Sequence, residues 1–287
     1  MKDNAPAPGP AAQSARRQRG VALITALLVV ALASVAAVSL TASHQLDLRR
    51  AQTSQAAGQA QLHAASVEAL AAEAVQEARL DADQAAEMLD EDCRTPPFVT
   101  EVQGVAVEAR LEDLHCRINL NNLLDDEDEE TEEGFIELVE TLNRDHRDFQ
   151  LDPAEIISAL RDWADPEVED DWYSRQDPPY RPSNQPLAVP SELLQIRGMN
   201  ADAYAILEPY VTALPQVGTT FNALAAPDAL REAFNLPDPE DMDPEDYGLG
   251  EYVQVALRLE IDDRLYHQCS VVHAPSGEVV IRRLQPC

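Results

Sequence analysis

Acidic and amide side chains gather in one proline-broken segment in the middle of the chain. Five hard oxygen donors fall within twenty residues: Asp165, Glu169, Asp170, Asp171 and Asn184. Calcium takes about six to eight oxygen ligands, some of them from irregular loops. Without a cation these carboxylates would repel one another, and a segment so poor in apolar residues would have little reason to order. The residues alone leave two interpretations open, a calcium site and a solvated acidic loop.

No pattern in the chain matches a common catalytic site. Six histidines are scattered without a His-x-x-x-His pair, and there is neither a Gly-x-Ser-x-Gly elbow nor a glycine-rich phosphate loop. Carboxylate pairs abound, but 52 Asp and Glu against 21 Lys and Arg supply them by chance. The net charge of −31 also disfavours nucleic acid, whose phosphates are bound by Lys and Arg. We therefore expect a non-enzymatic protein that binds a cation or a basic partner and no nucleic acid.

An uncharged apolar segment near the N-terminus predicts a membrane anchor. It runs from Val21 to Ser43, 23 residues that as a helix span roughly 34 Å, enough for the hydrocarbon core of a bilayer. Arg16, Arg17 and Arg19 precede it, and basic residues hold such an end in the cytoplasm. We therefore expect one membrane crossing, with the rest of the chain on the opposite side.

Three kinds of targeting segment compete for this region. A cleaved signal peptide has a shorter apolar core followed by an Ala-x-Ala-like site, and a plain signal anchor has no need of a glycine before its core. The third kind, a pilin-type leader, is cleaved after a glycine and keeps the apolar segment. The run Arg19-Gly20-Val21-Ala22-Leu23-Ile24 has this form, with cleavage between Gly20 and Val21. We favour this third interpretation, although the fifth position after the cut, usually Glu in pilins, is Thr25.

The apolar segment continues into an Ala-, Gln- and Glu-rich stretch without proline, from Leu46 to Glu91. Apolar residues recur there at three- and four-residue spacing, the pattern of an amphipathic helix. They are Leu62, Ala65, Ala69, Ala72 and Val75. We expect one spine helix over residues 21–91, with the membrane segment at 21–43. A short anchor followed by a separate helix, broken at Gly58, is the alternative.

Strand patterns flank a helical block in the rest of the chain. Residues 98–102 and 105–111 alternate around Gln103-Gly104, which predicts a β-hairpin. Residues 118–123 follow as a short irregular segment, and three more strands are predicted near the C-terminus, at 252–261, 264–273 and 277–284. Between them, helices are predicted after the caps Asp152, Ser191 and Asn200. The fold class is therefore α+β, an antiparallel sheet interrupted by an all-α insertion.

Four stretches together resemble the K-type minor pseudopilins of bacterial type II secretion, the general secretion pathway protein K family. They are the leader 19–24, the Ile-Asn-Leu-Asn run at 118–121, the segment 162–180 with its Asp-Trp-Ala-Asp-Pro and Glu-Asp-Asp-Trp-Tyr runs, and the segment 184–199. Their order and spacing cover most of the chain. The absence of glutamate at Thr25, which counts against most pilin families, is typical of this one.

The resemblance implies a pilin-like fold with a large helical insertion. Residues 1–20 would be the cleaved leader, 21–91 the spine, 92–124 and 212–287 a discontinuous pilin-like head, and 125–211 the inserted all-α domain. It also implies a calcium ion in the insertion, held by the five oxygen donors at 165, 169, 170, 171 and 184.

The resemblance further implies a role and a set of partners. The K subunit sits at the tip of a periplasmic pseudopilus with the I- and J-type minor pseudopilins. That complex initiates assembly, and the pseudopilus supports export of folded exoproteins through the secretin. A prepilin peptidase would cleave and methylate the chain, which would then reside in the inner membrane with its head in the periplasm.

An oxidising periplasm favours disulfides between the four cysteines. Three pairings are possible, and we predict Cys93–Cys116, tying the spine to the first hairpin, and Cys269–Cys287, pinning the C-terminal segment. Two other functions compete with the tip pseudopilin. One is a membrane-anchored, calcium-dependent adhesive subunit of a type IV pilus, and the other is a tethered periplasmic hydrolase, for which no site is recognisable.

Overall fold

The fold is known from a computed structural model of the whole chain. The structure describes residues 14–79, 89, 93–146, 150–167, 171–223, 226–237, 241–242 and 249–287, with the backbone alone over 14–20. The chain divides into two compact units, residues 1–59 and 60–287. The second unit holds the end of the first helix and all elements that follow it.

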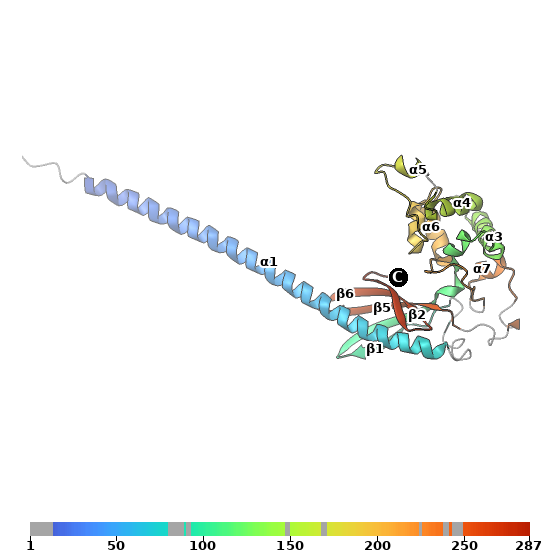
Figure 1. The fold of residues 1–287 in the computed structure, drawn as a ribbon. Coiled ribbons are helices and arrows are strands. Elements are labelled where there is room, and N and C mark those ends of the chain that lie inside the picture. Colours follow the sequence, from blue (N-terminus) through green and yellow to red (C-terminus); the bar gives the residue numbers. More distant parts are fainter. Residues whose placement is uncertain are drawn as a thin grey trace, which may run out of the picture. The chain divides into compact units, whose positions relative to one another are not determined.

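Helix α1 (Ser14–Ala78) is 65 residues long and continues from the first unit into the second (Figure 1). Alanine is the strongest helix former and no proline interrupts the segment, so its composition accounts for this length. The helix passes Gly58 unbroken, so the alternative of two helices separated there is wrong. It ends at Ala78 with Arg79 in a turn, short of the predicted limit at Glu91. Residues 80–88, 90 and 91 of the predicted helix lie outside the described residues.

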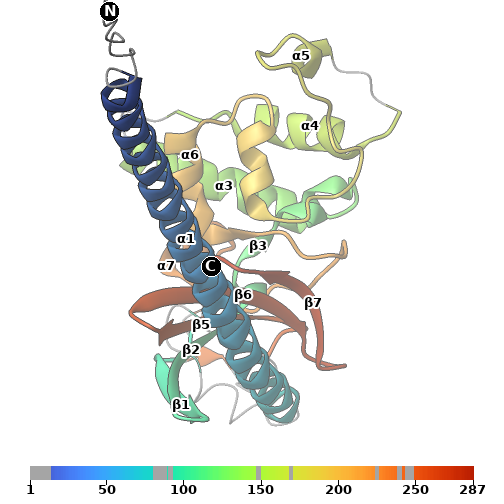
Figure 2. The same ribbon diagram turned by 90° about the vertical axis from the view of Figure 1, so that its left-hand side faces the viewer.

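Five strands in the described part of the chain form one antiparallel sheet, in the order β1-β2-β5-β6-β7 (Figure 2). They are β1 (Phe98–Val102), β2 (Val105–Asp113), β5 (Tyr252–Ile261), β6 (Arg264–His273) and β7 (Glu278–Arg283). The predicted hairpin turns at Gln103 and Gly104, whose φ angles of 52° and 83° are those a two-residue hairpin turn requires. All five predicted strands are present, with ends shifted by two residues at most.

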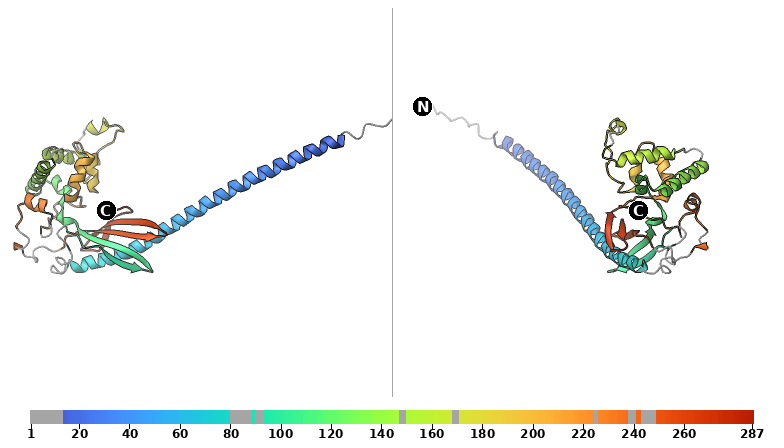
Figure 3. Two further views of the ribbon diagram at one scale, coloured as in Figure 1. Left: turned by 180° about the vertical axis from the view of Figure 1, so that it is seen from behind. Right: turned by 45° about the vertical axis from the view of Figure 1, so that its right-hand side comes forward.

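Strands β2 and β5 are direct neighbours although a long stretch of chain separates them. Ala109 faces Leu257 in their antiparallel register, and Figure 3 shows the green β1 and β2 beside the red C-terminal strands. The helical block is therefore inserted between two paired strands of one sheet, the discontinuous head expected from the sequence.

One face of the sheet packs on the end of α1. Its buried residues on β2 and β5 are Val107, Ala109, Leu111, Val253, Val255, Leu257 and Leu259. From position 60 onward, the buried residues of α1 are Ala60, Ala64, Val67, Glu68, Ala71, Ala72, Val75 and Ala78. These contacts hold the spine to the head.

The predicted apolar stripe of α1 is largely wrong. Leu62 is 71% exposed, and Ala65 and Ala69 are exposed as well, so only Ala72 and Val75 of the expected stripe are buried. Alanine lies on every side of this helix, and its small side chain gives a weak signal. The buried face is instead set by Glu68, whose carboxylate has partners on the sheet.

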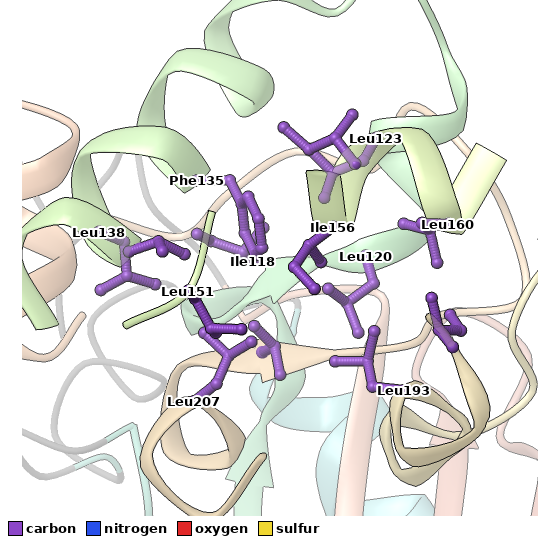
Figure 4. Close-up of a cluster of buried hydrophobic side chains, with 14 of the residues drawn as sticks. Ile118, Leu120, Leu123, Phe135, Leu138, Leu151, Ile156, Leu160, Leu193 and Leu207 are labelled. Atoms are coloured by element: carbon purple, nitrogen blue, oxygen red, sulfur yellow. The ribbon is translucent and has the colours of Figure 1, made fainter. Parts of the chain in front are cut away.

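The inserted block consists of short helices around one apolar core. Its elements are η1 (Leu114–Cys116), β3 (Ile118–Asn119), η2 (Leu120–Leu124), α3 (Glu129–Asp145), α4 (Pro153–Ala164), α5 (Asp171–Ser174), η3 (Pro190–Gln195), α6 (Ala201–Leu207), η4 (Glu208–Tyr210), β4 (Val211–Thr212) and α7 (Asp228–Ala233). Figure 4 shows Phe135 and Leu138 of α3, Ile156 and Leu160 of α4 and Leu193 of η3 directed into the same interior. This core is separate from the interface between α1 and the sheet.

The core of the insertion extends beyond the predicted limits of 125–211. On the N-terminal side it includes Ile118, Leu120 and Leu123, and on the C-terminal side it reaches Leu230 of α7. Helix α7 packs on α3, where the ring of Phe234 lies against Gly134. Both limits were wrong because the boundary was placed where the texture of the sequence changes, whereas apolar residues beyond that change still pack into the same core.

Two of the three predicted helix caps are confirmed. Asp152 accepts from the backbone N–H groups of Ala154 and Glu155 (3.0 and 3.3 Å), and Asn200 accepts from that of Ala203 (3.0 Å). The cap at Ser191 is wrong, because Ser191 lies inside η3. There the carboxylate of Glu192 accepts from the N–H groups of Ala188 and Val189 and replaces a serine cap.

Candidate functional site

The end of α4 brings two of the predicted calcium ligands together. Asp165 follows the last residue of α4, and its Oδ1 accepts from the backbone N–H of Glu167 (2.8 Å). Asn184, nineteen positions later, donates its backbone N–H to the carbonyl oxygen of Trp163 (3.0 Å) and has a φ of +52°. One carboxylate and one amide side chain therefore start from neighbouring backbone at the same helix end.

Of the other three predicted ligands, the structure describes only Asp171. Asp171 begins α5, where its carboxylate is 78% exposed and lies 2.9 Å from the guanidinium of Arg175. Glu169 and Asp170 lie outside the described residues. Within the described ranges, no three His, Cys, Asp or Glu side chains lie close enough to hold a metal ion. The oxygen chemistry of Asp165 and Asn184 suits calcium, but the site stays a prediction.

Aromatic side chains fix the loop between α4 and η3, which corrects one expectation. Tyr173 is fully buried, and its ring packs edge-on against Trp163 and Trp172, with centroids 5.3 and 5.0 Å apart. Tyr180 joins the cluster and donates its hydroxyl to the carbonyl oxygen of Gln195 (2.7 Å). Burial raises the pKa of Tyr180 above its ordinary value. The segment is therefore held by packed rings, and its order does not by itself require a cation. The two tryptophans pack the inserted block.

Three buried asparagines join the start of the insertion to its end. The Asn121 side chain accepts from the N–H of Leu187 (2.8 Å) and donates to the carbonyls of Leu187 and Leu214 (2.9 and 2.7 Å). Asn119 accepts from the N–H of Leu214 (3.0 Å), and Asn122 accepts from the N–H of Gly218 (3.0 Å). Residues 118–123 were predicted as a short irregular segment, and the run 118–121 as one of the stretches that carry the family resemblance. Polar residues alternating with Ile and Leu were the signal that it carries a buried hydrogen-bond network.

A buried carboxylate in α1 was also missed. The side chain of Glu68 is only 3% exposed, and it accepts hydrogen bonds from the Gln268 amide (2.8 Å), the Ser270 hydroxyl and the Arg282 guanidinium. Its place among alanines and valines three and four positions away was the available signal, because an acid on an apolar stripe needs a partner when buried.

The structure contains both expected disulfides. Cys93 is bonded to Cys116 across a separation of 23 residues, and Cys269 to Cys287 across 18. The first joins the segment before β1 to η1, and the second fixes the C-terminal segment against the middle of β6. Each pair keeps its Cα atoms within the normal disulfide range, at 6.2 and 5.1 Å.

The predicted anchor and cleavage position lie in α1. Gly20 and Val21 are both helical, and the helix contains a stretch long and apolar enough to cross a membrane. Within that stretch the hydroxyls of Thr25, Ser34 and Thr41 donate to carbonyl oxygens one turn earlier, at 3.0, 2.8 and 2.8 Å. Such bonds satisfy the hydroxyls without water, which suits a helix in lipid.

Comparison with known proteins connects these features. Residues 116–216 match the family model of type II secretion system (T2SS), protein K. The type II secretion system protein K of Aeromonas hydrophila is 30% identical over 217 residues, which are 70% of this chain and 65% of that protein. The chain is thus similar to the protein K family of type II secretion systems over residues 116–216, and to its members over about 70% of its own length. The protein K of Klebsiella pneumoniae is 32% identical over 211 residues, 69% of this chain and 63% of that protein. The protein K of Pseudomonas aeruginosa is 33% identical over 218 residues, which are 70% of this chain and 63% of that protein. The chain thus spans slightly less than two thirds of the length of these protein K relatives.

A solved structure shares the fold of this chain. A chain in the crystal structure of the GspK–GspI–GspJ complex from the enterotoxigenic Escherichia coli Type 2 Secretion System superposes with a TM-score of 0.62 at 18% identity. The superposition covers 83% of this chain and 100% of that one. The α+β class predicted from the sequence, with a long N-terminal helix and an antiparallel sheet head, is confirmed.

Proposed function

We propose that this protein is the K-type minor pseudopilin at the tip of a type II secretion pseudopilus. In this role it is a non-catalytic assembly subunit. It joins the I- and J-type minor pseudopilins, initiates the pseudopilus and thereby supports export of folded exoproteins through the secretin. Exoproteins themselves are further potential contacts of its head.

The insertion between β2 and β5 carries this proposal. The residues that match the protein K family model, 116–216, begin at Cys116 and cover the asparagine network, α3, α4, the aromatic loop and α6. A helical block of this size is an addition to a head whose sheet is already complete through the β2–β5 pairing. A subunit stacked above would have to make room for such a block, so it fits best at a filament end.

The N-terminal helix supports the same role. We propose that a prepilin peptidase cleaves between Gly20 and Val21 and methylates the new terminus, and that α1 then crosses the inner membrane once with the head in the periplasm. In filament pilins, a glutamate at the fifth mature position is thought to pair with a neighbour's N-terminal amine. Here Thr25 carries no charge and donates its hydroxyl to Ala22 of its own helix. A tip subunit has no subunit above it to pair with, so it has no need of the carboxylate.

Calcium binding is the second part of the proposal. Asp165 and Asn184 would contribute oxygen ligands beside the end of α4, with Glu169, Asp170 and Asp171 completing the set predicted from the sequence. The ion would supply charge neutralisation to a chain whose net charge is −31. An ion there would fix the position of the loop after α4, which the aromatic cluster already anchors on its other side.

Co-purification tests the tip role. The detergent-solubilised chain is mixed with I- and J-type minor pseudopilins from the same secretion system and separated by size-exclusion chromatography. We expect one complex that contains all three proteins. Failure to form it, with each protein monodisperse on its own, would count decisively against the tip role and in favour of the adhesive alternative.

Calorimetry with CaCl₂ tests the metal site separately. The parent chain should release or absorb heat with a defined stoichiometry, and Asp165→Ala and Asp170→Ala/Asp171→Ala should lose that binding. Glu260→Ala in β5 removes the same charge away from the loop and should bind like the parent. Absence of binding to the parent would end the calcium proposal and leave the tip role untouched.

A further inference from the structure

A groove lies between the sheet and the helical block, on the sheet face that does not contact α1. It has a volume of about 740 Å³, within the range of pockets that hold small molecules or short peptide segments. Its floor comes from β2, β5, β6 and β7, and its opposite wall from residues 188–191 and 204–213. Side chains alternate along β2, so that Val107, Ala109 and Leu111 face α1 while Glu108, Arg110 and Glu112 face the groove.

Basic side chains are concentrated in this groove. Five of the chain's 21 lysines and arginines line it, against three acidic side chains, in a protein whose net charge is −31. The arginines are Arg94, Arg110, Arg117, Arg258 and Arg283. A local excess of positive charge on so acidic a chain marks a place where an anionic group is favoured.

The acids of the groove neutralise three of the five arginines. Glu112 is 6% exposed and holds two guanidinium groups, that of Arg94 at 3.2 Å and that of Arg117. Glu108 pairs with Arg258 at 3.1 Å. The third acid, Glu208, accepts from the hydroxyl of Tyr204 on the opposite wall (3.2 Å). Two arginines are left without a carboxylate partner among the described residues, namely Arg110 and Arg283.

These two arginines lie in one row across the sheet. In the strand registers, Arg110 of β2 is paired with Ala256 of β5. Ala256 is paired in turn with Cys269 of β6, and Cys269 with Arg283 of β7. Their backbones are therefore three strand spacings apart, about 14 Å. The Arg283 side chain donates to the sulfur of Cys269 (3.5 Å), and its buried Nε–H has no acceptor within the described structure. Ala256 and Cys269 lie between the two arginines in the row, and the disulfide from Cys269 to Cys287 brings residues 285–287 to the groove as well.

We propose that this groove binds an extended acidic peptide segment of another protein, with Arg110 and Arg283 each holding one carboxylate. Guanidinium groups bind carboxylates in bidentate fashion, and an unsatisfied buried Nε–H gains the acceptor that it lacks. An extended chain rises about 3.3 Å per residue, so carboxylates about four residues apart match the row and point to the same side.

The charge pattern selects a peptide over a nucleic acid. Glu108, Glu112 and Glu208 lie in the same groove and would repel a polymer with a phosphate on every unit. Two separated carboxylates with uncharged residues between them avoid these acids and still reach both arginines. The apolar groups Ala256 and Val271 on the floor suit the uncharged middle of such a segment.

Fluorescence anisotropy with a labelled peptide tests the proposal on the detergent-solubilised full chain. The probe is an eight-residue peptide of Ser, Val and Gly with two Asp residues four positions apart, and its Asn-substituted version is the control ligand. We expect the Asp peptide to bind more tightly, with affinity that falls as salt rises. Equal binding of the two peptides, or no binding of either, would overturn the proposal.

Matched variants locate the site. Arg110→Gln/Arg283→Gln should weaken binding by about tenfold or more, since each charged hydrogen-bonded pair lost is of that order. Arg144→Gln/Arg175→Gln removes the same two charges from exposed positions outside the groove, one in α3 and one after α5, and should bind like the parent. Equal weakening by both pairs would mean a general charge effect and would sink the proposal.

A steric variant covers the case in which the arginine variants do not fold. Ala256→Trp fills the floor while leaving both arginines in place, so it should also abolish binding, and retained binding would contradict the groove location. The assay needs no I- or J-type subunit. Its failure would leave the proposed tip role standing, and failure of the tip role would leave this groove standing.

Discussion

The carboxylate of Glu68 on α1 is bound by the guanidinium of Arg282 on β7, from the opposite end of the chain. The two side chains differ in burial, since that of Glu68 is 3% exposed and that of Arg282 is 49% exposed. The hydrogen bond to Glu68 raises the pKa of Arg282 above its ordinary value. This contact selects which side of an alanine-rich helix faces the sheet.

Removal of Arg282 should therefore destabilise the head. Arg282→Ala leaves the buried Glu68 carboxylate with only the neutral Gln268 and Ser270 donors, which we expect to cost about 2 kcal/mol. The estimate is below that for a fully buried pair because Arg282 is half exposed. Thermal unfolding of the solubilised chain should shift down by about 4–8 °C.

Arg258→Ala is the matched control for this variant. It breaks the exposed pair with Glu108, in which the side chains are 54% and 41% exposed. We expect a change below about 1 kcal/mol. Equal unfolding temperatures of the two variants would show that Arg282 does not stabilise the buried Glu68 carboxylate.

Two glycines in helices should respond in opposite ways to alanine. A Cβ on Gly134 of α3 would overlap the ring of Phe234, so Gly134→Ala should destabilise by about 1–3 kcal/mol despite alanine's better helix propensity. A Cβ on Gly58 of α1 would meet no neighbouring atom within 4 Å, so Gly58→Ala should be neutral or stabilise by about 0.5–1 kcal/mol. Chemical denaturation of both variants measures the contrast, and a stabilised Gly134→Ala would contradict the packing of α7 on α3.

The asparagine network predicts a large effect from one small change. Asn121→Ala removes the partners of three buried backbone groups, two on Leu187 and one on Leu214, and we expect a cost of about 2–3 kcal/mol. Asn121→Asp keeps the acceptor for the Leu187 N–H but loses both donors, so it should also be destabilising. Hydrogen exchange at the Leu187 amide should speed up in the alanine variant more than in the aspartate variant. The same exchange rate in both would show that the Asn121 side chain does not hold this amide.

The Tyr204 hydroxyl should lose its proton at a higher pH than an ordinary tyrosine. Burial, followed by the charge and hydrogen bond of Glu208, raises its pKa from 10.0 to about 12. The folded state thus favours the protonated phenol. This contribution to stability is complete below pH 10 and is lost as pH rises from there to about 12. A difference titration of tyrosinate absorbance between the parent and Tyr204→Phe isolates the group. A difference curve centred near the ordinary value would show that Glu208 does not contact Tyr204 in solution.

The Cys93–Cys116 disulfide should resist reduction while the chain is folded. Cys93 and Cys116 are each 1% exposed, so a reductant reaches this bond only after unfolding, whereas the exposed Cys287 leaves one end of the other bond accessible. Cys116→Ser should lower stability by about 3 kcal/mol, because the bond closes a loop of 23 residues in the unfolded chain. Mass mapping without reductant should return Cys93–Cys116 and Cys269–Cys287. Four alkylated thiols under those conditions would rule out both bonds.

Local signals in the sequence were sufficient for the sheet strands and for helices α4 and α6 of this protein, but not for α3 and α7. The hairpin at Gln103-Gly104, the five strands and the caps at Asp152 and Asn200 follow from alternation, turn residues and side-chain acceptors within a few positions. The apolar stretch from Val21 and the absence of a charge at Thr25 are equally local properties. They determined the fold class and the family resemblance, because hydrophobic period and backbone capping act over short stretches of chain.

Only the tertiary structure decided which surfaces meet. The buried side of α1 carries Glu68, whose partner Arg282 lies more than two hundred positions away, and the small side chains of an alanine-rich helix give only a weak periodic signal for this side. The limits of the insertion depend on Leu230 and Phe234 returning to the core of α3, and the order of the acidic loop depends on the rings of Tyr173 and Tyr180. The row from Arg110 to Arg283 exists only through the register of four strands. Long-range packing sets these relationships, since each side chain gains its stabilisation from a partner that the local sequence does not contain.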